Sequence, residues 1–248
     1  MNKFSHKEYI SILESIKNNY NVLDYTDINE DTESFAIVRH DIEFSPYRAL
    51  NLAKIDHDLG IKSSFFIQLR NNCYNALSTE NLDIVNHILS LGHSVGAHIN
   101  TSSLFTYDEN YISKFITQDI LTLEKYTGAK IDRFSFHRPT KNQLKNPVRI
   151  PNIINAYDNL YFHYFEEKTP INLKVLYLAD SNHQWKWGKP TLDNFARHKK
   201  LHINFHPFSW TKNGYTNLVN FKTLTKEKNK ELLNSFNSEI NNFPKELL

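Results

Sequence analysis

Residues 34–69 read SFAIVRHDIEFSPYRALNLAKIDHDLGIKSSFFIQL and contain two apolar runs on either side of a more polar segment. The runs at 34–38 and 63–69 are short and rich in residues that favour β-strands. The segment 46–60 begins with Pro and ends with Gly, which is typical of an α-helix. Strand, helix and strand in this order predict a βαβ unit with parallel strands.

The same alternation continues along the chain. Further strands are predicted over 93–99, 131–137, 153–157, 172–180 and 200–206, and helices over 78–92, 107–128, 191–198 and 222–241. No Gly-, Ser- or Pro-rich linker and no internal repeat divides the chain. We therefore expect an α/β protein: a single catalytic domain over 1–248, folded as a distorted (β/α) barrel of about seven parallel strands. An open doubly wound sheet is the alternative, although no Gly-rich phosphate loop follows the first strand.

Composition and the N-terminal segment indicate which partners and which compartment the protein has. The 248 residues carry a formal charge of +2 with acids and bases mixed, which does not favour a nucleic-acid polymer as partner. One cysteine, Cys73, cannot form an intrachain disulfide and fits a reducing compartment. The first twenty residues predict an amphipathic helix with Ser5 and Glu8 in capping-box spacing, not a signal peptide. No apolar run approaches the ~20 residues of a membrane span, so a cytoplasmic protein is expected.

Polar side chains that can do chemistry gather at the ends of five predicted strands. They are His40, Asp41 and Glu43, then His98, then His137 and Arg138, then Asp180, and finally His206. In a parallel barrel all strand carboxyl ends open on one face, where active sites are built. A single histidine at a strand end is more often packed or solvated than functional. The recurrence at equivalent positions is what favours a shared site.

Histidine and carboxylate together suit Zn²⁺ or a similar divalent ion, which makes water acidic enough to attack a carbonyl. Asp41 and Glu43 are two positions apart in an extended segment, so both can face one pocket. One can then bind the metal while the other acts as general base. Like-charged carboxylates need a cation nearby, and the metal, Arg39 or Arg138 can supply it.

Several short motifs in this order resemble the polysaccharide deacetylase superfamily, carbohydrate esterase family 4. They are IVRHDIEFS (37–45), LGHSVGAHI (91–99), FSFHRP (134–139) and NFHP (204–207). NAYD (155–158) and YLADSNHQWKWGKP (177–190) further resemble a branch encoded with bacterial surface-polysaccharide genes, such as those for O-antigen. The resemblance spans roughly residues 35 to 210. It implies a distorted barrel and metal-dependent hydrolysis of an N-acyl group on a sugar.

The resemblance also implies roles for individual residues. Asp41 maps to the catalytic base and Glu43 to a metal ligand, although the family has Asp at the second position. His98 matches the first histidine of a His-x-x-x-His motif, but Ser102 stands at the second. A third protein ligand then comes from elsewhere, with His137 or His206 as candidates and water as the alternative; we assign His137. The remaining implied roles are orientation of the base by Arg138, the general acid for His206 and orientation of that acid by Asp180. Arg39 and His40 are also expected to contact substrate. Trp185, Trp187 and Trp210 are expected to stack on sugar faces, with packing in the core or at the rim as the alternative.

The expected function is removal of an N-formyl or N-acetyl group from an amino sugar, with Zn²⁺ as the expected metal. The lack of a signal peptide favours a small nucleotide-linked sugar over an extracellular polymer. Two alternatives stay open: a catalytically impaired sugar-binding module, which the Ser102 and Glu43 departures motivate, and another metal-dependent amidohydrolase. A serine hydrolase is disfavoured because no Gly-x-Ser-x-Gly motif occurs. A homo-oligomer is possible, because the C-terminal helix can dock on its own barrel or on a second copy.

Overall fold

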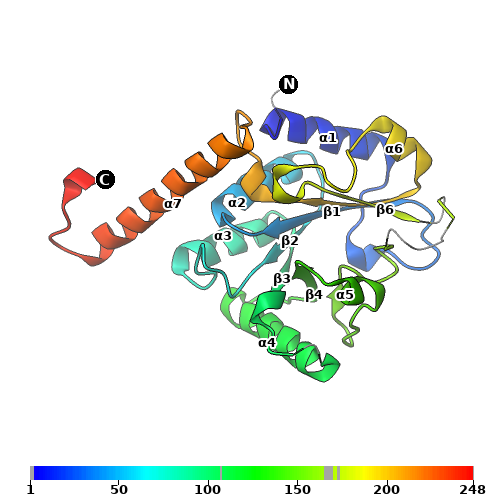
Figure 1. Ribbon diagram of the computed structural model, residues 1–248, viewed down its shortest axis with the longest axis horizontal. Coiled ribbons are helices and arrows are strands. Elements are labelled where there is room, and N and C mark those ends of the chain that lie inside the picture. The colour runs from blue at the N-terminus through cyan, green and yellow to red at the C-terminus, as the bar shows by residue number, and fades with distance from the viewer. Residues whose placement is uncertain (1–2, 107, 165–169, 172–173, 248) are drawn as a thin grey trace.

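The computed structural model describes residues 3–106, 108–164, 170–171 and 174–247. In this part of the chain seven strands form one sheet, every neighbouring pair is parallel, and the order is β5-β4-β3-β2-β1-β7-β6. The sheet is curled into a partial barrel (Figure 1), which confirms the predicted distorted (β/α) barrel of seven parallel strands. The strands are β1 (Phe35–Ile42), β2 (Ser64–Ile67), β3 (Ser94–Asn100), β4 (Arg133–His137), β5 (Ile154–Asn155), β6 (Val175–Ala179) and β7 (Lys200–Phe205).

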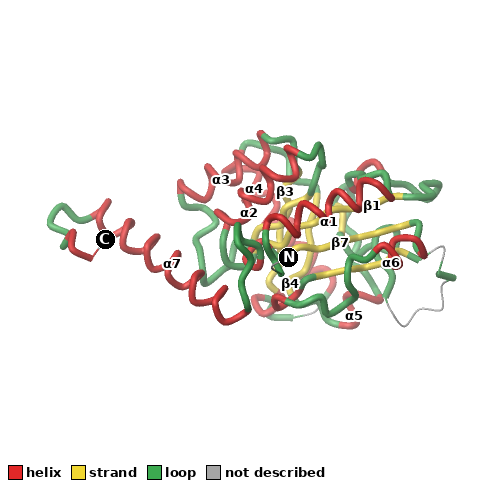
Figure 2. The backbone as a smooth tube through the Cα atoms, turned by 90° about the horizontal axis from the view of Figure 1, so that it is seen from above, coloured by secondary structure: helices red, strands yellow, loops and turns green. Residues whose placement is uncertain are grey.

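Helices follow most strands, and several of them cover the outside of the sheet, whereas the last helix projects away from it (Figure 2). The first and last positions of the predicted helices act as caps: the Ser78 and Thr191 side chains accept backbone N–H groups at two helix starts, and Gly128 ends a helix at φ 68°. None of the described helices is both long and apolar enough to cross a membrane. The helices are α1 (His6–Asn19), α2 (Pro46–Asp58), α3 (Thr79–Ser90), α4 (Glu109–Thr127), α5 (Lys141–Lys145), α6 (Leu192–Arg197) and α7 (Asn217–Glu239).

Some boundaries differ from the predicted ones. β1 continues to Ile42 instead of ending at residue 38, because its polar residues are paired on both faces of the sheet and therefore need no solvent. α7 begins at Asn217 instead of 222, where buried Asn220 accepts a hydrogen bond from Arg48. The short α5 was not predicted, and β5 contains two residues instead of five. Residues 107, 172 and 173 of the predicted elements lie outside the described residues.

The side chains of β1 alternate between two hydrophobic clusters, one on each face of the sheet. All eight of its residues are buried. Phe35 and Ile37 belong to the cluster inside the barrel, whereas Ala36 and Val38 pack in the cluster under α1. Burial of both faces is typical of a parallel sheet covered by helices. The inward-facing side chains of β1 continue with Arg39 and Asp41. The same strand therefore gives apolar side chains to the barrel interior and polar side chains to its carboxyl end.

Buried polar groups hold the amino end of the barrel, opposite the mouth. Arg133 on β4 donates to both carboxylate oxygens of Asp24, at 2.8 and 2.9 Å. His202 on β7 lies between the Tyr25 hydroxyl, 2.9 Å from its Nε2, and the Tyr161 carbonyl, 3.1 Å from its Nδ1. Burial and, to a lesser extent, the nearby Arg39 charge lower the pKa of His202 to about 3. A neutral ring with its proton on Nδ1 satisfies both partners.

We expect His202→Asn to weaken the pH dependence of stability in acid. The unfolded chain protonates this histidine below pH ~6.5, while the native protein does so only near pH 3, so stability falls as pH drops through that window. Between pH 7 and pH 4.5 the loss is about 2 to 3 kcal/mol in the wild type. Urea unfolding at both pH values measures it. The exposed His87→Asn is the matched control. Equal losses in wild type and His202→Asn would contradict the assignment.

Candidate active site

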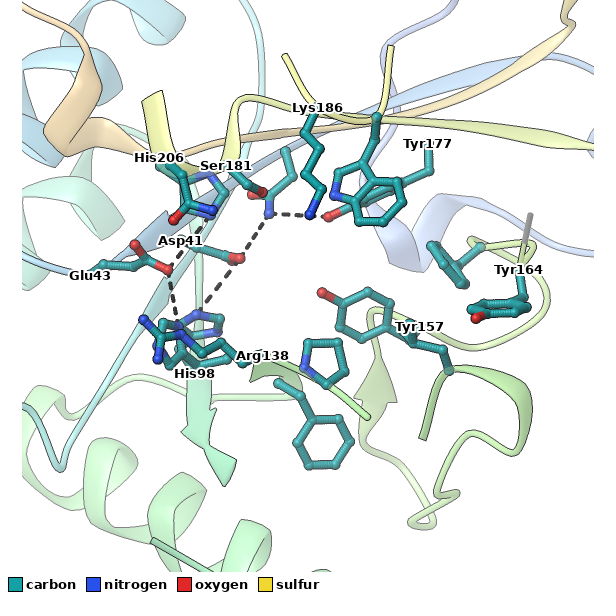
Figure 3. A pocket seen from close by; sticks show the side chains of 18 of the residues that line it. Asp41, Glu43, His98, Arg138, Tyr157, Tyr164, Tyr177, Ser181, Lys186 and His206 are labelled. Atoms are coloured by element: carbon teal, nitrogen blue, oxygen red, sulfur yellow. Dashed lines mark hydrogen bonds and ion pairs between the residues drawn. The ribbon is translucent and has the colours of Figure 1, made fainter. Parts of the chain in front are cut away.

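A cavity of about 1000 Å³ opens at the carboxyl ends of the strands. Its lining includes Asp41 from β1, Glu43 just beyond it, His98 from β3, His137 at the end of β4 and His206 just after β7. Figure 3 shows Asp41, Glu43, His98 and His206 facing one another across the mouth. The structure thus brings together strand ends that are far apart in sequence, as the parallel barrel predicts.

Glu43, His98 and His137 offer ligand atoms that all lie within 4.8 Å of one another. Glu43 Oε1 is 3.0 Å from His137 Nδ1. His98 Nδ1 lies 2.7 Å from the Ser135 hydroxyl, which fixes the ring and leaves Nε2 toward the cluster. That Nε2 is buried and has no hydrogen-bond partner. Burial lowers the pKa of His98 to about 4, so the ring is neutral. A buried, unpartnered lone pair beside carboxylate and imidazole fits a divalent metal ion.

Asp41 is held by a cation on its own strand. Arg39 Nε and Nη2 donate to its two carboxylate oxygens at 2.8 and 2.9 Å, and Asn204 Nδ2 donates to Oδ2 at 2.8 Å. Asp41 Oδ2 is also 3.7 Å from His98 Nε2. Burial alone would raise the pKa of Asp41, but the Arg39 charge outweighs it and holds the pKa well below its usual range. The carboxylate is therefore ionised and oriented toward the cavity.

Arg138 does not take the orienting role that the resemblance implies for it. Its side chain is exposed at the rim of the cavity, and its backbone has a φ of 53°. The cation that pairs with Asp41 is Arg39, which is fully buried. The alternation of β1 explains this, because residues 39 and 41 point to the same side of the strand. The expected substrate contact of Arg39 does not fit this placement, since Arg39 lies behind Asp41.

Asp180 holds His206 by two contacts, one to its ring and one to its backbone. His206 Nδ1 lies 2.7 Å from Asp180 Oδ1, which also accepts the His206 backbone N–H at 2.8 Å. Trp210 Nε1 donates to the other oxygen, Oδ2, at 2.5 Å. Burial lowers the pKa of His206, but Asp180, Glu43 and Asp41 outweigh it and raise the pKa to about 9. His206 is protonated at neutral pH, with Nε2 3.7 Å from Glu43 Oε1.

Three residues predicted to contact substrate lie away from the cavity. His40 is on the outer side of β1, where its Nε2 is 2.8 Å from Asp56 Oδ2 of α2. Trp210 is fully buried behind Asp180, and Trp185 packs against Trp210 and Phe205. Alternate side chains of β1 point to opposite sides of the sheet, so His40 points outward, away from the cavity. Trp210 is buried because its indole N–H donates to Asp180. Trp187 does line the cavity, with its side chain 45% exposed.

Ser102 does not reach the metal-ligand cluster. It follows β3, is exposed, and donates to Asn100 Oδ1 at 2.8 Å. His137 stands with Glu43 and His98 in the place where the resemblance leaves a ligand missing.

Four residues of the site were missed in the sequence: Asn204, which holds Asp41; Ser135, which holds His98; and Tyr157 and Tyr177, which line the cavity. The first two had a detectable signal. Ser135 and Asn204 each precede a predicted site histidine by two positions, so they share its side of the strand. The two tyrosines carried no such pattern.

Comparison with known proteins gives only distant likenesses. The chain matches no protein-family model and no curated protein. Similar solved structures include the catalytic domain of a peptidoglycan N-acetylglucosamine deacetylase from Eubacterium rectale (11% identity, 82% of this chain, 88% of that chain, TM-score 0.46). A CE4 family pseudoenzyme from Bacillus anthracis (13%, 82%, 63%, 0.42) and a family 4 acetyl xylan esterase from Clostridium thermocellum in complex with a cobalt ion (14%, 77%, 84%, 0.39) are also similar. The function proposed below therefore rests on the geometry of the site.

Proposed function

We propose that this protein hydrolyses an N-acyl group from an amino sugar, with a divalent metal ion as cofactor. The observation that carries the proposal is the placement of an ionised carboxylate, Asp41, and a protonated histidine, His206, around the Glu43–His98–His137 cluster. Hydrolysis of an amide needs a base for water, an acid for the departing amine and stabilisation of the oxyanion. One cavity mouth offers groups for all three.

Glu43, His98 and His137 would hold the metal ion. Two imidazoles and one carboxylate leave a position open for water or substrate, which is the ligand pattern of catalytic zinc sites. A divalent ion at these ligands would supply Lewis acidity, which lowers the pKa of water and polarises an amide carbonyl. Zn²⁺ is our expected ion because the ligands are nitrogen and oxygen. Ser135 positions His98 so that its Nε2 faces the cluster.

Asp41 is the proposed general base. It is ionised, faces the cavity and is not needed to complete the three-residue ligand set. Arg39 and Asn204 hold it by three hydrogen bonds, so its orientation is set before substrate arrives. The fixed carboxylate can accept the proton that water loses as it attacks the amide carbon.

His206 is the proposed general acid. Asp180 holds the proton on Nδ1, so the second N–H, on Nε2, is directed to the cavity beside Glu43. That proton can pass to the amide nitrogen as the C–N bond breaks, which releases the sugar as an amine. Trp210 fixes Asp180 from the other side, so the pair keeps its geometry during the transfer.

The finer features of the proposal are those expected from the sequence. They are an N-formyl or N-acetyl group, a nucleotide-linked sugar, surface-polysaccharide biosynthesis including O-antigen, a cytoplasmic location, a single domain over 1–248 and a possible homo-oligomer. The cavity supports a substrate larger than a monosaccharide, since about 1000 Å³ is at the upper end for small-molecule pockets.

We expect His98→Ala to weaken divalent-metal binding by more than about 100-fold, because loss of a ligand exceeds the cost of losing a supporting hydrogen bond. The wild type should bind one ion per chain when titrated with Zn²⁺ or Co²⁺ and analysed for metal content after dialysis. Ser102→Ala is the control, since Ser102 lies outside the cluster, and it should bind metal like the wild type. Full metal content in His98→Ala would remove His98 from the ligand set.

Activity is tested by incubating the metal-loaded protein with N-formyl and N-acetyl amino sugars, free and nucleotide-linked, and measuring amine release. Release of amine supports the proposal. A folded, metal-loaded protein that is inactive on all of these sugars but binds them would support the sugar-binding module. Hydrolysis of other amides with none of the sugars turned over would support another amidohydrolase.

A further inference from the structure

The cavity extends well beyond the catalytic cluster. In Figure 3 Lys186 and Tyr177 lie on one side of this extension and Tyr157 and Tyr164 on the other, while Asp41, Glu43, His98 and His206 occupy the opposite end. We call the extension the aromatic–basic arm. We define it by seven of the residues that line the cavity: Tyr157, Tyr164, Tyr177, Trp187, Lys141, Lys174 and Lys186.

The aromatic part of the arm is built as a rigid wall with one exposed ring. Phe162 packs edge-on against both Tyr157 and Tyr177, with ring centroids 5.2 Å apart in each pair. Trp187 is 45% exposed, and Lys186 Nζ lies 5.2 Å from its ring centroid. Rings of this kind can stack on a sugar face or on a nucleobase, so the aromatic residues alone do not identify the ligand.

The charges of the lining residues distinguish a neutral sugar chain from a nucleotide as the ligand. The described lining contains two carboxylates, Asp41 and Glu43, and both belong to the catalytic end. Asp41 is paired with Arg39 and Glu43 with His137. Among the residues that the structure describes, the arm contributes three lysines and no carboxylate. A neutral oligosaccharide gains little from lysines, whereas phosphate oxygens are their usual partners.

We propose that the aromatic–basic arm binds the diphosphate and base of a nucleoside diphosphate sugar. Lys141, Lys174 and Lys186 would contact the phosphates and Trp187 would stack on the base, which leaves the N-acyl group of the sugar at the catalytic cluster. The inference rests on the proposed function for the position of the sugar, but the arm itself binds the nucleotide without any chemistry.

Isothermal titration calorimetry with UDP, dTDP, pyrophosphate, uridine and chitotriose tests the arm. The protein is used metal-free, with a chelator present, so that the diphosphate cannot bind through an ion. UDP or dTDP should bind at least tenfold more tightly than pyrophosphate or uridine, because only the nucleotides contact lysines and Trp187 together. Binding should also weaken with added salt, since the contacts to phosphate are ionic.

Three variants locate the binding. Lys186→Gln and Trp187→Ala should each weaken UDP binding about tenfold or more. The exposed Lys54→Gln on α2 is the matched control for charge removal and should bind like the wild type. UDP that binds no more tightly than uridine, or equally in Lys186→Gln and wild type, would overturn the inference. Chitotriose binding more tightly than either nucleotide would also overturn it and would point to a polymer substrate.

These results are separable from the proposed function. Amine release from free N-acyl sugars without nucleotide binding would leave the hydrolase proposal intact and remove the inference. Nucleotide binding without amine release from any N-acyl sugar would do the reverse.

Discussion

Replacing Asp41 by Asn is expected to reduce turnover by about 10²- to 10⁴-fold, because the amide cannot accept the proton that water gives up. The bound metal should be retained, since the proposed ligand set is Glu43, His98 and His137. Turnover is measured per folded, metal-loaded chain with the preferred N-acyl sugar. If Asp41→Asn loses turnover but keeps its full metal content, Asp41 acts as a base and not as a metal ligand.

The control for Asp41→Asn is the same chemical change on the surface. Asp58→Asn at the exposed end of α2 should leave both turnover and metal content as in the wild type. Loss of metal in Asp41→Asn would move Asp41 into the ligand set. Turnover within a few-fold of wild type would exclude Asp41 as the base and leave the carboxylate a structural partner of Arg39.

Replacing Arg39 by Met is expected to lower the free energy of unfolding by about 3 to 5 kcal/mol, because it strands the buried Asp41 carboxylate. Arg39 is fully buried and gives Asp41 two of its three hydrogen bonds. Urea unfolding at pH 7 measures the effect. Arg133→Met at the other end of the barrel is a useful comparison, since it removes a two-bond arginine partner from a buried carboxylate away from the cavity. Its effect should be smaller, because Asp24 keeps Thr26, Ser94 and Lys62 as partners.

The double variant Arg39→Met/Asp41→Asn separates the pair from packing. Removing both charges leaves no unpaired buried ion, so the double variant should be more stable than Arg39→Met alone. Arg39→Lys, which keeps the charge but cannot donate the same two parallel hydrogen bonds, should recover part of the stability and less of the turnover. If the double variant is less stable than Arg39→Met, the pair does not account for the burial of Arg39.

The sequence predicted the barrel because the physics of the fold is local and repeated. Most predicted strands are apolar runs next to a predicted helix, and Ser78 and Gly128, at the first and last positions of two predicted helices, are caps in the structure. The polar residues at strand ends were equally visible. Parallel topology alone then brings His98, His137 and His206 to one mouth, without any knowledge of side-chain contacts.

Several side-chain contacts of the site could not be predicted from the sequence. The sequence left the metal, Arg39 and Arg138 open as the cation beside the carboxylates, and the resemblance assigned the orienting role to Arg138. The structure shows Arg39 in this role, because alternation turns residue 39 toward residue 41. His40 was assigned to substrate because the strand was expected to end at residue 38, whereas β1 continues to Ile42 and turns His40 outward to Asp56. Tyr157 and Tyr177 come from β5–β6 segments whose side-chain placement no periodicity encodes.

The pairing of Arg39 with Asp41 on a single strand has a consequence for how this protein can change. The proposed base is held by Arg39 on β1 and by Asn204 on the neighbouring β7, and Arg39 in turn donates to Tyr157 just after β5. In the described part of the chain, none of the hydrogen bonds of Arg39 or Asp41 comes from the loop between β4 and β5. Substitutions, insertions or grafted sequences around Arg138 can therefore alter the rim without a penalty at the base. For directed evolution toward new acyl groups or sugars, that loop is the segment to randomise first, with the interior row of β1 held constant.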